Sequence, residues 1–585
     1  MRGGPLSTPV WLQHYDPQVP PTLTYPEKTL PQMLEDTARS YPHQTATHVV
    51  LAYVWNGRIG ITGSLTYQQV SDYVDRLAGA LYDLGVRKGD RVALVLPNMP
   101  QFVIAFFAAL KLGALVVNNN PQYTAPELRH QLRDSGAETV IILNLFWPSL
   151  EPILGETGVK RVIMTYAYDL LPAPMRQLVR IQQRRSPEWA DAPRDQPNLH
   201  FFTQLLRSRR PAPPPVAISP DETALLQYTG GTTGTPKAAM LSHRNLISNA
   251  VQAITWIDVL QPGKETFLLA IPFFHVYGMT TGLICGILSG SKLVLIPNPR
   301  PITLVMESIQ RQKATIMPGV PALYLAIVNH PKVRSYQLGS ITGCISGSAP
   351  LPVTLQQQFE QITGGRLVEG FGLTEAAPVT HCTPLYGTRK AGSIGLPFPD
   401  TEAKIIDPNT GEALPFDGQS RGELVVRGPQ VMQGYWNNRN ETELTLGADG
   451  WLHTGDVCTV DEDGFFFVVD RMKDIIKASG FQVLPREVED VLYEHPAVLQ
   501  CCVVGIPHPT RGDDTVTAYI VLRPGASATA EELRELCASK LIKYKVPRTF
   551  IFRSALPQSS VGKILRRQLL EEALRERSSG QGMVS

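Results

Sequence analysis

The stretch YTGGTTGTPKAAMLSHRNL, residues 228–246, combines residue types that can bind phosphate. Between Thr229 and Lys237 it contains four threonines, three glycines, one proline and one lysine, and no bulky apolar side chain. Glycines leave backbone N–H groups uncovered, threonines add hydroxyl donors, and the lysine adds a cation. A Walker A loop requires Gly-Lys-Ser/Thr in succession, whereas this stretch has Pro236-Lys237-Ala238. Taken alone, it fits a glycine- and threonine-rich surface turn equally well.

The elements around this stretch alternate in type from about residue 64 onward. Buried strands are predicted for the apolar runs 91–98, 114–119 and 139–143, and helices for 100–113 and 125–136. The phosphate-binding stretch itself lies between a predicted strand at 222–228 and a predicted helix at 243–254. Strand and helix in turn indicate an α/β fold with largely parallel sheets.

The totals indicate a globular protein with more than one domain. The chain has 585 residues, which exceeds what a single core usually holds, and 43% are apolar and 18% charged. The formal net charge is only +2, so nothing points to nucleic acid as a partner. The cysteines show no CxxC or Cys/His zinc spacing, which favours buried thiols in a reducing cytosol. They are Cys285, Cys344, Cys382, Cys458, Cys501, Cys502 and Cys537.

Two stretches bear on membranes and export. The N-terminal residues have no apolar core of a signal peptide, so we expect no secretory signal. Residues 268–290 carry no Asp, Glu, Lys or Arg and are long enough to span a bilayer. Pro272 and His275 interrupt that stretch, so we predict a buried strand to about Phe274, a turn and a buried helix.

Residues 171–215 interrupt the alternation and are rich in arginine. One interpretation is a solvated surface insertion closed by the stiff segment RRPAPPPVAISP. The other is a peripheral membrane contact in which apolar side chains accompany the arginines. The arginines are Arg176, Arg180, Arg184, Arg185, Arg194, Arg207, Arg209 and Arg210; the apolar residues are Leu178, Val179, Ile181, Phe201, Phe202, Leu205 and Leu206.

A change of pattern near residue 470 predicts a domain boundary. A strand there is followed by a charged turn, a glycine-containing loop and a helix that opens after Pro485. We predict a large domain over residues 1–470, a small α+β domain over 471–585, and a hinge at Asp470–Asp474.

Six motifs, in order, resemble those of the adenylate-forming enzymes: acyl-CoA synthetases, peptide-synthetase adenylation domains and firefly-type luciferases. They are YTGGTTGTPK (228–237), SGSAPLP (346–352), VEGFGLTEAAP (368–378), GWLHTGD (450–456), DRMKDIIKASGFQVLPREVE (470–489) and SSVGKILRRQLL (559–570). The match spans roughly residues 30 to 572. Details such as PFFHVYG, PQVMQGYW and YKVPRTF are most similar to bacterial long-chain fatty acid:CoA ligases. Ala238 departs from the family's usual glycine, and we expect little effect beyond a tighter approach for Lys237.

The resemblance implies a large multi-layer N-terminal domain, a small mobile C-terminal domain and a reaction in two steps. A fatty acid carboxylate attacks the α-phosphate of ATP with Mg²⁺ as cofactor, giving acyl-AMP and pyrophosphate. The thiol of coenzyme A then displaces AMP. A long-chain fatty acid:CoA ligase of the cytoplasm is the expectation, with peripheral attachment to the inner membrane face and a homodimer left open.

The resemblance also implies which residues of the large domain bind ATP. The phosphate residues are Thr229, Gly230, Gly231, Thr232, Thr233, Gly234 and Lys237. The adenine residues are Ser348, Ala349, Pro350, Phe371 and Gly372. Thr374 would donate to the α-phosphate, and Glu375 would bind Mg²⁺. The alternatives are a core aromatic for Phe371 and a solvated loop residue for Glu375.

The resemblance also implies that Asp456, near the end of the large domain, and Arg471, at the start of the small domain, bind the ribose. Lys563 of the small domain would reach the reacting oxygens. A turn-forming aspartate and a solvated basic face are the alternatives for Asp456 and Lys563. Lys473 occupies the hinge position, and the loop of Ser479, Gly480 and Phe481 would meet the pantetheine arm of coenzyme A. His275 resembles the residue beside the carboxylate pocket, although a satisfied buried histidine stays open.

Two rival functions stay open at this point. A stand-alone adenylation enzyme would load the acyl group onto a carrier protein instead of coenzyme A. A lipid-binding protein would have lost catalysis, although Glu375, Asp456 and Lys563 are all present. The preferred chain length depends on the depth of a tunnel, which the sequence does not reveal.

Overall fold

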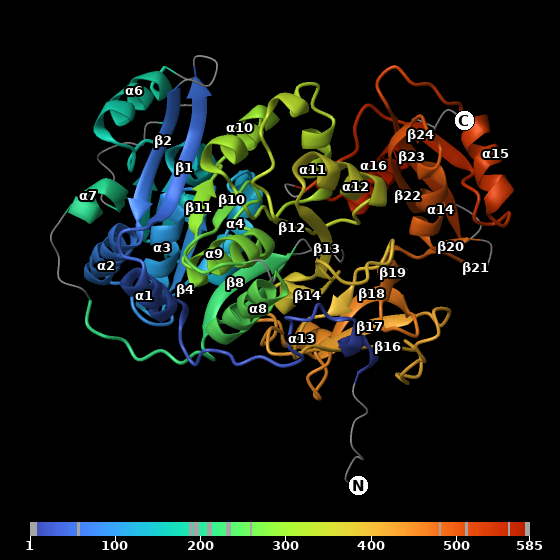
Figure 1. Ribbon diagram of the computed structural model, residues 1–585, viewed down its shortest axis with the longest axis horizontal. Helices are drawn as coiled ribbons and strands as arrows, with labels where there is room; N and C mark the ends of the chain where they lie inside the picture. The colour runs from blue at the N-terminus through green and yellow to red at the C-terminus, as the bar shows by residue number, and fades with distance from the viewer. Residues whose placement is uncertain are drawn as a thin grey trace, which may run out of the picture. The chain divides into compact units, whose positions relative to one another are not determined.

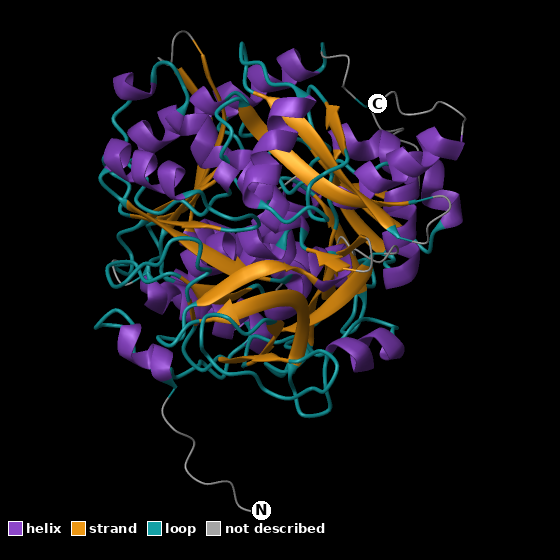
Figure 2. Cartoon of the chain, turned by 90° about the vertical axis from the view of Figure 1, so that its right-hand side faces the viewer, coloured by secondary structure: helices purple, strands orange, loops and turns teal. Residues whose placement is uncertain are grey.

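The computed structural model describes residues 9–54, 59–185, 190, 198–207, 213–229, 236–257, 260–478, 481–508, 513–559 and 562–578. The chain forms two compact units. The first unit comprises Met1–Glu402 and Arg427–Leu452, and the second comprises Ala403–Val426 and His453–Ser585. Helices and strands occur together throughout the chain, as Figures 1 and 2 show. The α/β fold class is confirmed. The predicted hinge at 470–474 lies inside the second unit and stays a prediction.

A seven-stranded sheet dominates the first unit, with strand order β7-β6-β5-β3-β4-β8-β9. The bounds in that order are Leu199–Phe201, Arg161–Thr165, Thr139–Leu143, Arg91–Val95, Leu115–Asn118, Thr223–Thr229 and Lys237–Ser242. All pairs are parallel except β8 with β9. The inner strands are short apolar runs buried on both faces, as parallel sheets require. Helices α3 (Pro100–Lys111) and α4 (Ala125–Ser135) follow β3 and β4 as predicted.

Strand β9 was not predicted. It intervenes between the predicted strand at 222–228 and helix α8 (His243–Trp256), and it pairs antiparallel with β8. Lys237 is therefore the first residue of a strand, opposite Thr229, rather than part of an extended loop. Ser242 ends β9 and caps α8 by accepting a hydrogen bond from the Asn245 amide.

A second sheet has the order β10-β11-β1-β2. Its bounds in that order are Thr266–Leu269, Lys292–Leu295, Thr45–Val54 and Ile59–Thr66. Further helices of the first unit are α1 (Leu30–Ser40), α2 (Tyr67–Asp83), α5 (Trp147–Leu150), α9 (Cys285–Leu288), α10 (Ile302–Gln312) and α11 (Pro321–Val328). Shorter 3₁₀ turns are η1 (Val10–His14), η2 (Asn144–Phe146), η3 (Glu151–Glu156) and η5 (Val333–Ser335).

The uncharged stretch 268–290 is a strand, a turn and a helix, but its boundaries differ from the prediction. Strand β10 ends at Leu269 instead of Phe274. A π-helix over Gly278–Ile284 then leads into α9. No helix in the part of the chain that the structure describes is both long and apolar enough to cross a membrane.

A third sheet carries two of the motifs, with order β12-β13-β14-β15. Its bounds are Gly343–Ser346, Arg366–Gly372, Val379–Cys382 and Leu396–Pro397. Helix α12 (Val353–Thr363) connects β12 to the parallel strand β13. The 3₁₀ turn η6 (Thr374–Ala376) follows β13, and helix α13 (Arg439–Thr445) lies near the end of this unit in sequence.

The arginine-rich insertion folds into α6 (Ala173–Gln183), β7 and α7 (Phe202–Arg207), and α6 lies at the periphery of the view in Figure 1. Four of the seven apolar residues considered for a membrane contact are instead buried in the core: Val179, Phe202, Leu205 and Leu206. Leu178 and Ile181 are 52% and 55% exposed. The membrane hypothesis was therefore wrong for the buried four, because they provide the apolar face that attaches the insertion. Arg194, Arg209 and Arg210 lie outside the described residues.

The second unit contains three sheets. The bounds of β16 to β19 are Glu402–Ile406, Gly422–Arg427, Leu452–Val460 and Phe466–Arg471, and η7 (Met472–Asp474) follows. Strands β20 (Ile476–Ala478) and β21 (Phe481–Val483) pair antiparallel within the predicted glycine-containing loop, whose Ser479 and Gly480 lie outside the described residues. Helix α14 (Pro485–Tyr493) begins at Pro485, as predicted to within one residue. The last sheet and its helices are β22 (Val498–Pro507), β23 (Asp514–Leu522), β24 (Thr549–Phe552), α15 (Ala530–Lys540) and α16 (Arg566–Ser578).

All seven cysteines are buried and free, as the sequence indicated. Burial raises the pKa of the Cys285 and Cys382 thiols well above the usual range. These thiols are therefore protonated at neutral pH and pack as small apolar side chains.

Candidate active site

The candidate phosphate-binding stretch, residues 228–237, is anchored by the ends of two paired strands. Thr229 ends β8 and Lys237 opens β9, and the two residues lie opposite each other. Both side chains are half-buried. The intervening candidates lie outside the described residues: Gly230, Gly231, Thr232, Thr233 and Gly234.

A remote segment, residues 432–442, packs along β9; we call it the bracing segment. Its backbone pairs with β9 through hydrogen bonds from the Trp436 amide to the Ala238 carbonyl (2.8 Å) and from the Met240 amide to the Gly434 carbonyl (2.9 Å). Tyr435 and Ala239 form an antiparallel bridge. This pairing brings side chains of the bracing segment to two of the predicted site residues.

Lys237 and Glu375 each have a charged or polar partner in the bracing segment. Lys237 forms an ion pair with Glu441, and its Nζ atom lies 5.2 Å from the centre of the Tyr435 ring. The Tyr435 hydroxyl donates to Glu375 Oε1 at 2.6 Å, and the Met432 amide donates to the Glu375 carbonyl at 2.8 Å. Burial, and then the charge of Glu375, raise the pKa of Tyr435 far above its usual range. Tyr435 is therefore a constant hydrogen-bond donor to this carboxylate.

The motif that contains Glu375 turns sharply after β13. A Cβ atom added to Gly372 would lie 1.9 Å from the Pro378 carbonyl oxygen, so only glycine fits there. Ala377 has φ 62°, in the left-handed region that non-glycine residues rarely adopt. Phe371 and Thr374 are half-buried, and the Phe371 ring meets His381 edge-on at 6.0 Å. Phe371 therefore keeps an accessible face and is not a fully enclosed core aromatic.

The turn after β12 is tied to β13 by Glu369. One carboxylate oxygen of Glu369 accepts a hydrogen bond from the Leu351 amide at 3.1 Å. Ser348 has φ 70°, and Ser348 and Pro350 are exposed while Ala349 is half-buried. A strained, exposed turn held from behind presents its backbone to a ligand without moving.

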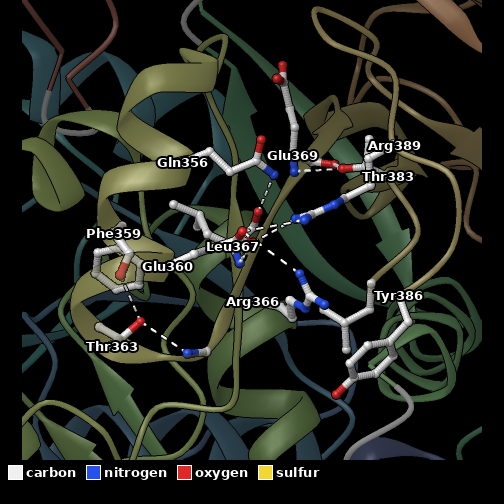
Figure 3. A network of polar contacts seen from close by, with 12 residues as sticks. Gln356, Phe359, Glu360, Thr363, Arg366, Leu367, Glu369, Thr383, Tyr386 and Arg389 are labelled. Carbon is white, nitrogen blue, oxygen red and sulfur yellow. Dashed lines mark hydrogen bonds and ion pairs between the residues drawn. The ribbon is translucent and has the colours of Figure 1, made fainter.

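A polar network fixes the start and middle of β13, as Figure 3 shows. Gln356 and Glu360, both on α12, bind the two backbone groups of Leu367 at 2.6 Å and 3.0 Å. Arg389 donates to Glu360 at 2.6 Å, which neutralises that carboxylate. The hydroxyl of Thr383 accepts from the Glu369 amide at 2.8 Å. The strand that leads to Phe371 and Glu375 is therefore held on both sides.

His275 precedes the π-helix and is neutral at physiological pH. Burial lowers the pKa of His275 to about 4, so its ring offers one donor and one acceptor and no charge. Two residues on, the Tyr277 hydroxyl donates to the Ile345 carbonyl at 2.7 Å, and its ring lies against Gly347. A π-helix is a rare element that often accompanies a functional site.

In the second unit, Asp456 and Arg471 face each other across β18 and β19. Arg471 Nε lies 3.0 Å from Asp456 Oδ1. Asp456 is 2% exposed, and its Oδ2 atom is buried without a hydrogen-bond partner among the described residues. Burial raises the pKa of Asp456, against the opposing effects of Arg471 and Lys563. A buried carboxylate oxygen of this kind can accept a hydrogen bond from a hydroxyl group.

Lys563 belongs to the same cluster. Taken over all its atoms, Lys563 is exposed to solvent. Its ammonium group, however, lies among other charged side chains, where loss of hydration and then the charge of Arg471 lower the pKa of Lys563 to about 8. Arg566, in the same basic run, binds the buried carboxylate of Glu489 at 2.6 Å and 2.7 Å. This run is therefore only partly a solvated basic face.

Two of the other candidates of the second unit, Lys473 and Phe481, are exposed. Lys473 is exposed in η7, after Asp470, whose carboxylate accepts from the Arg471 and Arg486 amides at 2.8 Å each. Phe481 is 55% exposed and stacks on Tyr544 at 4.5 Å. Ser479 and Gly480 lie outside the described residues.

The structure thus assembles two groups of candidates. Lys237, Glu375 and Tyr435 meet in the first unit, and Asp456, Arg471 and Lys563 meet in the second. Sequence reasoning missed Tyr435 and Glu441. The only signal for them was the family-like string PQVMQGYW and the polar residues after it, which carry no local mark of chemistry. The first group suits phosphates and a cation, and the second suits a ribose and a developing negative charge.

Comparisons with known proteins agree over nearly the whole chain. The AMP-binding enzyme family matches residues 34–436, and the AMP-binding enzyme C-terminal domain matches residues 487–563. A long-chain-fatty-acid–CoA ligase from Bacillus subtilis (strain 168) is 42% identical over 96% of this chain and 98% of its own length. One from Escherichia coli O157:H7 is 38% identical, again over 96% and 98%. The crystal structure of the anthranilate CoA ligase AuaEII in complex with anthranoyl-AMP has a TM-score of 0.79 at 28% identity, covering 95% of this chain and 99% of that one.

Proposed function

The chain belongs to the AMP-binding enzyme family, and we propose that it is a long-chain fatty acid:CoA ligase that forms acyl-CoA through acyl-AMP. The observation that carries this proposal is the similarity to long-chain-fatty-acid–CoA ligases, which extends over almost the full length of both chains. The substrates are a fatty acid, ATP and coenzyme A, and the products are acyl-CoA, AMP and pyrophosphate.

In the first step, residues of the first unit bind the nucleotide. Lys237 and Thr229 would contact the β- and γ-phosphates, and Thr374 would donate to the α-phosphate. The half-exposed ring of Phe371 would cover the adenine beside the strained turn at Ser348, which supports the assignment. Because both reactants are anions, the main task of these groups is to offset negative charge.

The residues present fit Mg²⁺, with Glu375 as the protein ligand. The hydrogen bond from Tyr435 uses Glu375 Oε1, which leaves Oε2 for a metal. Within the described residues, no group of three or more His, Cys, Asp or Glu side chains could hold a metal by itself. A metal held here must take most ligands from phosphate and water, as Mg²⁺ commonly does. When bound, Mg²⁺ supplies charge neutralisation at the phosphates.

The second unit would bind the ribose and serve the reacting oxygens. Asp456 would accept hydrogen bonds from the ribose hydroxyls, using Oδ2, which has no partner among the described residues, and Arg471 would be the second contact. Lys563 would place a cation near the bond that forms between carboxylate and α-phosphate. We further propose that the second step needs a rotation about Lys473, after which Ser479, Gly480 and Phe481 meet the pantetheine arm.

His275 would border the carboxylate end of the fatty acid site. Its pKa of about 4 makes it a neutral hydrogen-bonding group, so it would orient the carboxylate without neutralising it. A neutral neighbour preserves the nucleophilicity of the carboxylate, whereas an imidazolium would withdraw charge from it.

Weak contact with an anionic membrane is part of this proposal. Leu178 and Ile181 are exposed three residues apart on α6, with Arg180 between them. Exposed aliphatic side chains beside arginines suit the interface of an anionic bilayer.

The test is the reaction itself, run with purified chain, Mg-ATP, coenzyme A and fatty acids of eight to eighteen carbons. We expect acyl-CoA, AMP and pyrophosphate in equal amounts, with the highest kcat/KM for long chains, because each buried methylene adds about 0.8 kcal/mol. A parallel reaction offers a phosphopantetheinyl carrier protein in place of coenzyme A. Preferential loading of the carrier would favour the adenylation enzyme, and no pyrophosphate release would favour a lipid-binding protein.

A further inference from the structure

Lys237 has a counterion before any nucleotide arrives. Its ammonium group pairs with Glu441 and lies over the Tyr435 ring. The side chain of Lys237 is 14% exposed and that of Glu441 is 36% exposed, so the pair is only partly screened by water. The cation that the proposed function assigns to the terminal phosphates is therefore already engaged.

The backbone around Glu441 is held by several hydrogen bonds. Its amide donates to Asn438 Oδ1 at 3.2 Å at the start of α13. The Thr442 hydroxyl accepts from the Tyr435 amide at 2.8 Å and donates to the Asn438 carbonyl at 2.8 Å. Tyr435 is itself paired with β9. The long, flexible Lys237 side chain can turn toward a new anion while the backbone that carries Glu441 stays in place.

The surroundings of the pair are acidic. Lys237 and Glu441 line a cavity of about 300 Å³ together with Asp134, Trp436 and Asn438. One carboxylate oxygen of Asp134 accepts from the Tyr228 hydroxyl at 2.6 Å. Two carboxylates and one ammonium give this cavity a negative balance, so Glu441 and a bound polyphosphate would compete for the charge of Lys237.

We propose that Glu441 is a positioning residue that competes with the β- and γ-phosphates for Lys237 and thereby promotes the release of pyrophosphate. The inference rests on the proposed function, which assigns Lys237 to those phosphates. When nucleotide binds, the ammonium leaves Glu441 for the phosphates. After acyl-AMP forms, the lysine returns to Glu441, which weakens the hold on pyrophosphate. AMP lacks the terminal phosphates, so its binding is insensitive to Glu441.

Calorimetric titration of the full chain with pyrophosphate, with AMP and with a non-hydrolysable ATP analogue, each with Mg²⁺, tests this inference. We expect Glu441→Gln to bind pyrophosphate and the ATP analogue about three- to tenfold more tightly, and AMP as the wild type does. Pyrophosphate should also inhibit acyl-CoA formation at correspondingly lower concentration.

Two matched variants locate the effect. Glu443→Gln removes the same charge from the same helix, where Glu443 pairs with Arg439 at the surface, and it should leave all three affinities unchanged. In a Lys237→Ala background, Glu441→Gln should lose its gain, because the cation for which the two anions compete is absent.

Unchanged or weaker pyrophosphate binding by Glu441→Gln would overturn the inference, and so would an equal gain for AMP. If Glu441→Gln fails to fold, Glu441→Asp decides by the same criterion, because it withdraws the carboxylate from Lys237 by one methylene. A wild-type chain that binds neither pyrophosphate nor AMP and forms no acyl-CoA would instead refute the proposed function, and the inference with it.

Discussion

The two groups of candidate residues differ in how far their charged side chains are already paired. In the first unit, Lys237 and Glu375 already have partners, Glu441 and Tyr435. In the second unit, Asp456 is buried and its Oδ2 has no hydrogen-bond partner in the part of the chain that the structure describes, and Lys563 has a lowered pKa. Lys237 must exchange an existing contact to bind a phosphate, whereas Asp456 has an oxygen that can gain a contact while Oδ1 keeps its ion pair with Arg471. Substitutions in the second group should therefore cost more function.

The largest effect is expected for Lys563→Ala. If its cation acts only while negative charge gathers between carboxylate and α-phosphate, the variant should slow acyl-AMP formation by about 10²- to 10³-fold. Thioester formation from supplied acyl-AMP and coenzyme A should stay near wild type. The two half-reactions are measured separately on one preparation, and equal loss in both would remove the case for Lys563 as a first-step residue.

Asp456→Asn should weaken AMP binding without lowering the melting temperature of the chain. Loss of the charged acceptor should weaken AMP binding by about 10- to 100-fold, as hydrogen bonds to charged groups contribute about 1.5–3 kcal/mol. Burial raises the pKa of Asp456 in the folded chain above its ordinary value. The contribution of Asp456 to the free energy of unfolding therefore decreases as the pH rises from the ordinary pKa toward the raised one. The uncharged variant should therefore melt no lower than the wild type at pH 8. Glu462→Gln, at an exposed site of the same unit, is the control, and a large drop in melting temperature for Asp456→Asn would contradict this account.

The pH profile of kcat/KM for ATP should reflect Lys563. Because its pKa lies near 8, the ammonium is mostly lost by pH 9, and kcat/KM should fall about tenfold between pH 7 and pH 9. In Lys563→Arg, which stays charged, the decline should move beyond pH 10 even if the rate is lower overall. An identical decline in both proteins would assign the titration to another group.

The smallest of these effects is expected for Tyr435→Phe, in the group whose partners are already in place. The variant keeps the ring beside Lys237 and removes the hydrogen bond to Glu375. We expect about tenfold more Mg²⁺ to be needed for binding of an ATP analogue, because partners of a metal ligand orient it. AMP binding without metal should not change. If Tyr435→Phe weakens nucleotide binding by a larger factor than Asp456→Asn does, the contrast between the two groups is wrong.

Helices and strands were predicted well from the sequence where the spacing of apolar residues shows which side chains are buried. The inner strands β3, β4 and β5 and the helices α3 and α4 are recognisable because their apolar periodicity matches a sheet covered on both faces. Strand β9, with the sequence KAAMLS, lacks such periodicity, and its second neighbour is Tyr435, almost 200 residues later. The π-helix was likewise unpredictable, because its sequence also fits an α-helix.

The candidate site was predicted by family resemblance rather than by local pattern. The motifs identified Glu375, Asp456 and Lys563, but nothing in their vicinity indicated which would be paired and which unpartnered. That information lies in tertiary contacts: the Tyr435 hydroxyl on Glu375, and the absence of a donor at Asp456 Oδ2 among the described residues. Glu441 was missed because a glutamate in a short polar helix resembles any solvated residue.

The pairing of Lys237 with Glu441 also sets an order of events during synthesis. The two residues are 204 positions apart in the chain. At about 5–20 residues per second, the ribosome adds Glu441 roughly 10–40 s after Lys237. The lysine of a nascent chain thus spends that interval without its carboxylate, and this corner of the enzyme reaches its mature electrostatic state only after three quarters of the polypeptide has been made.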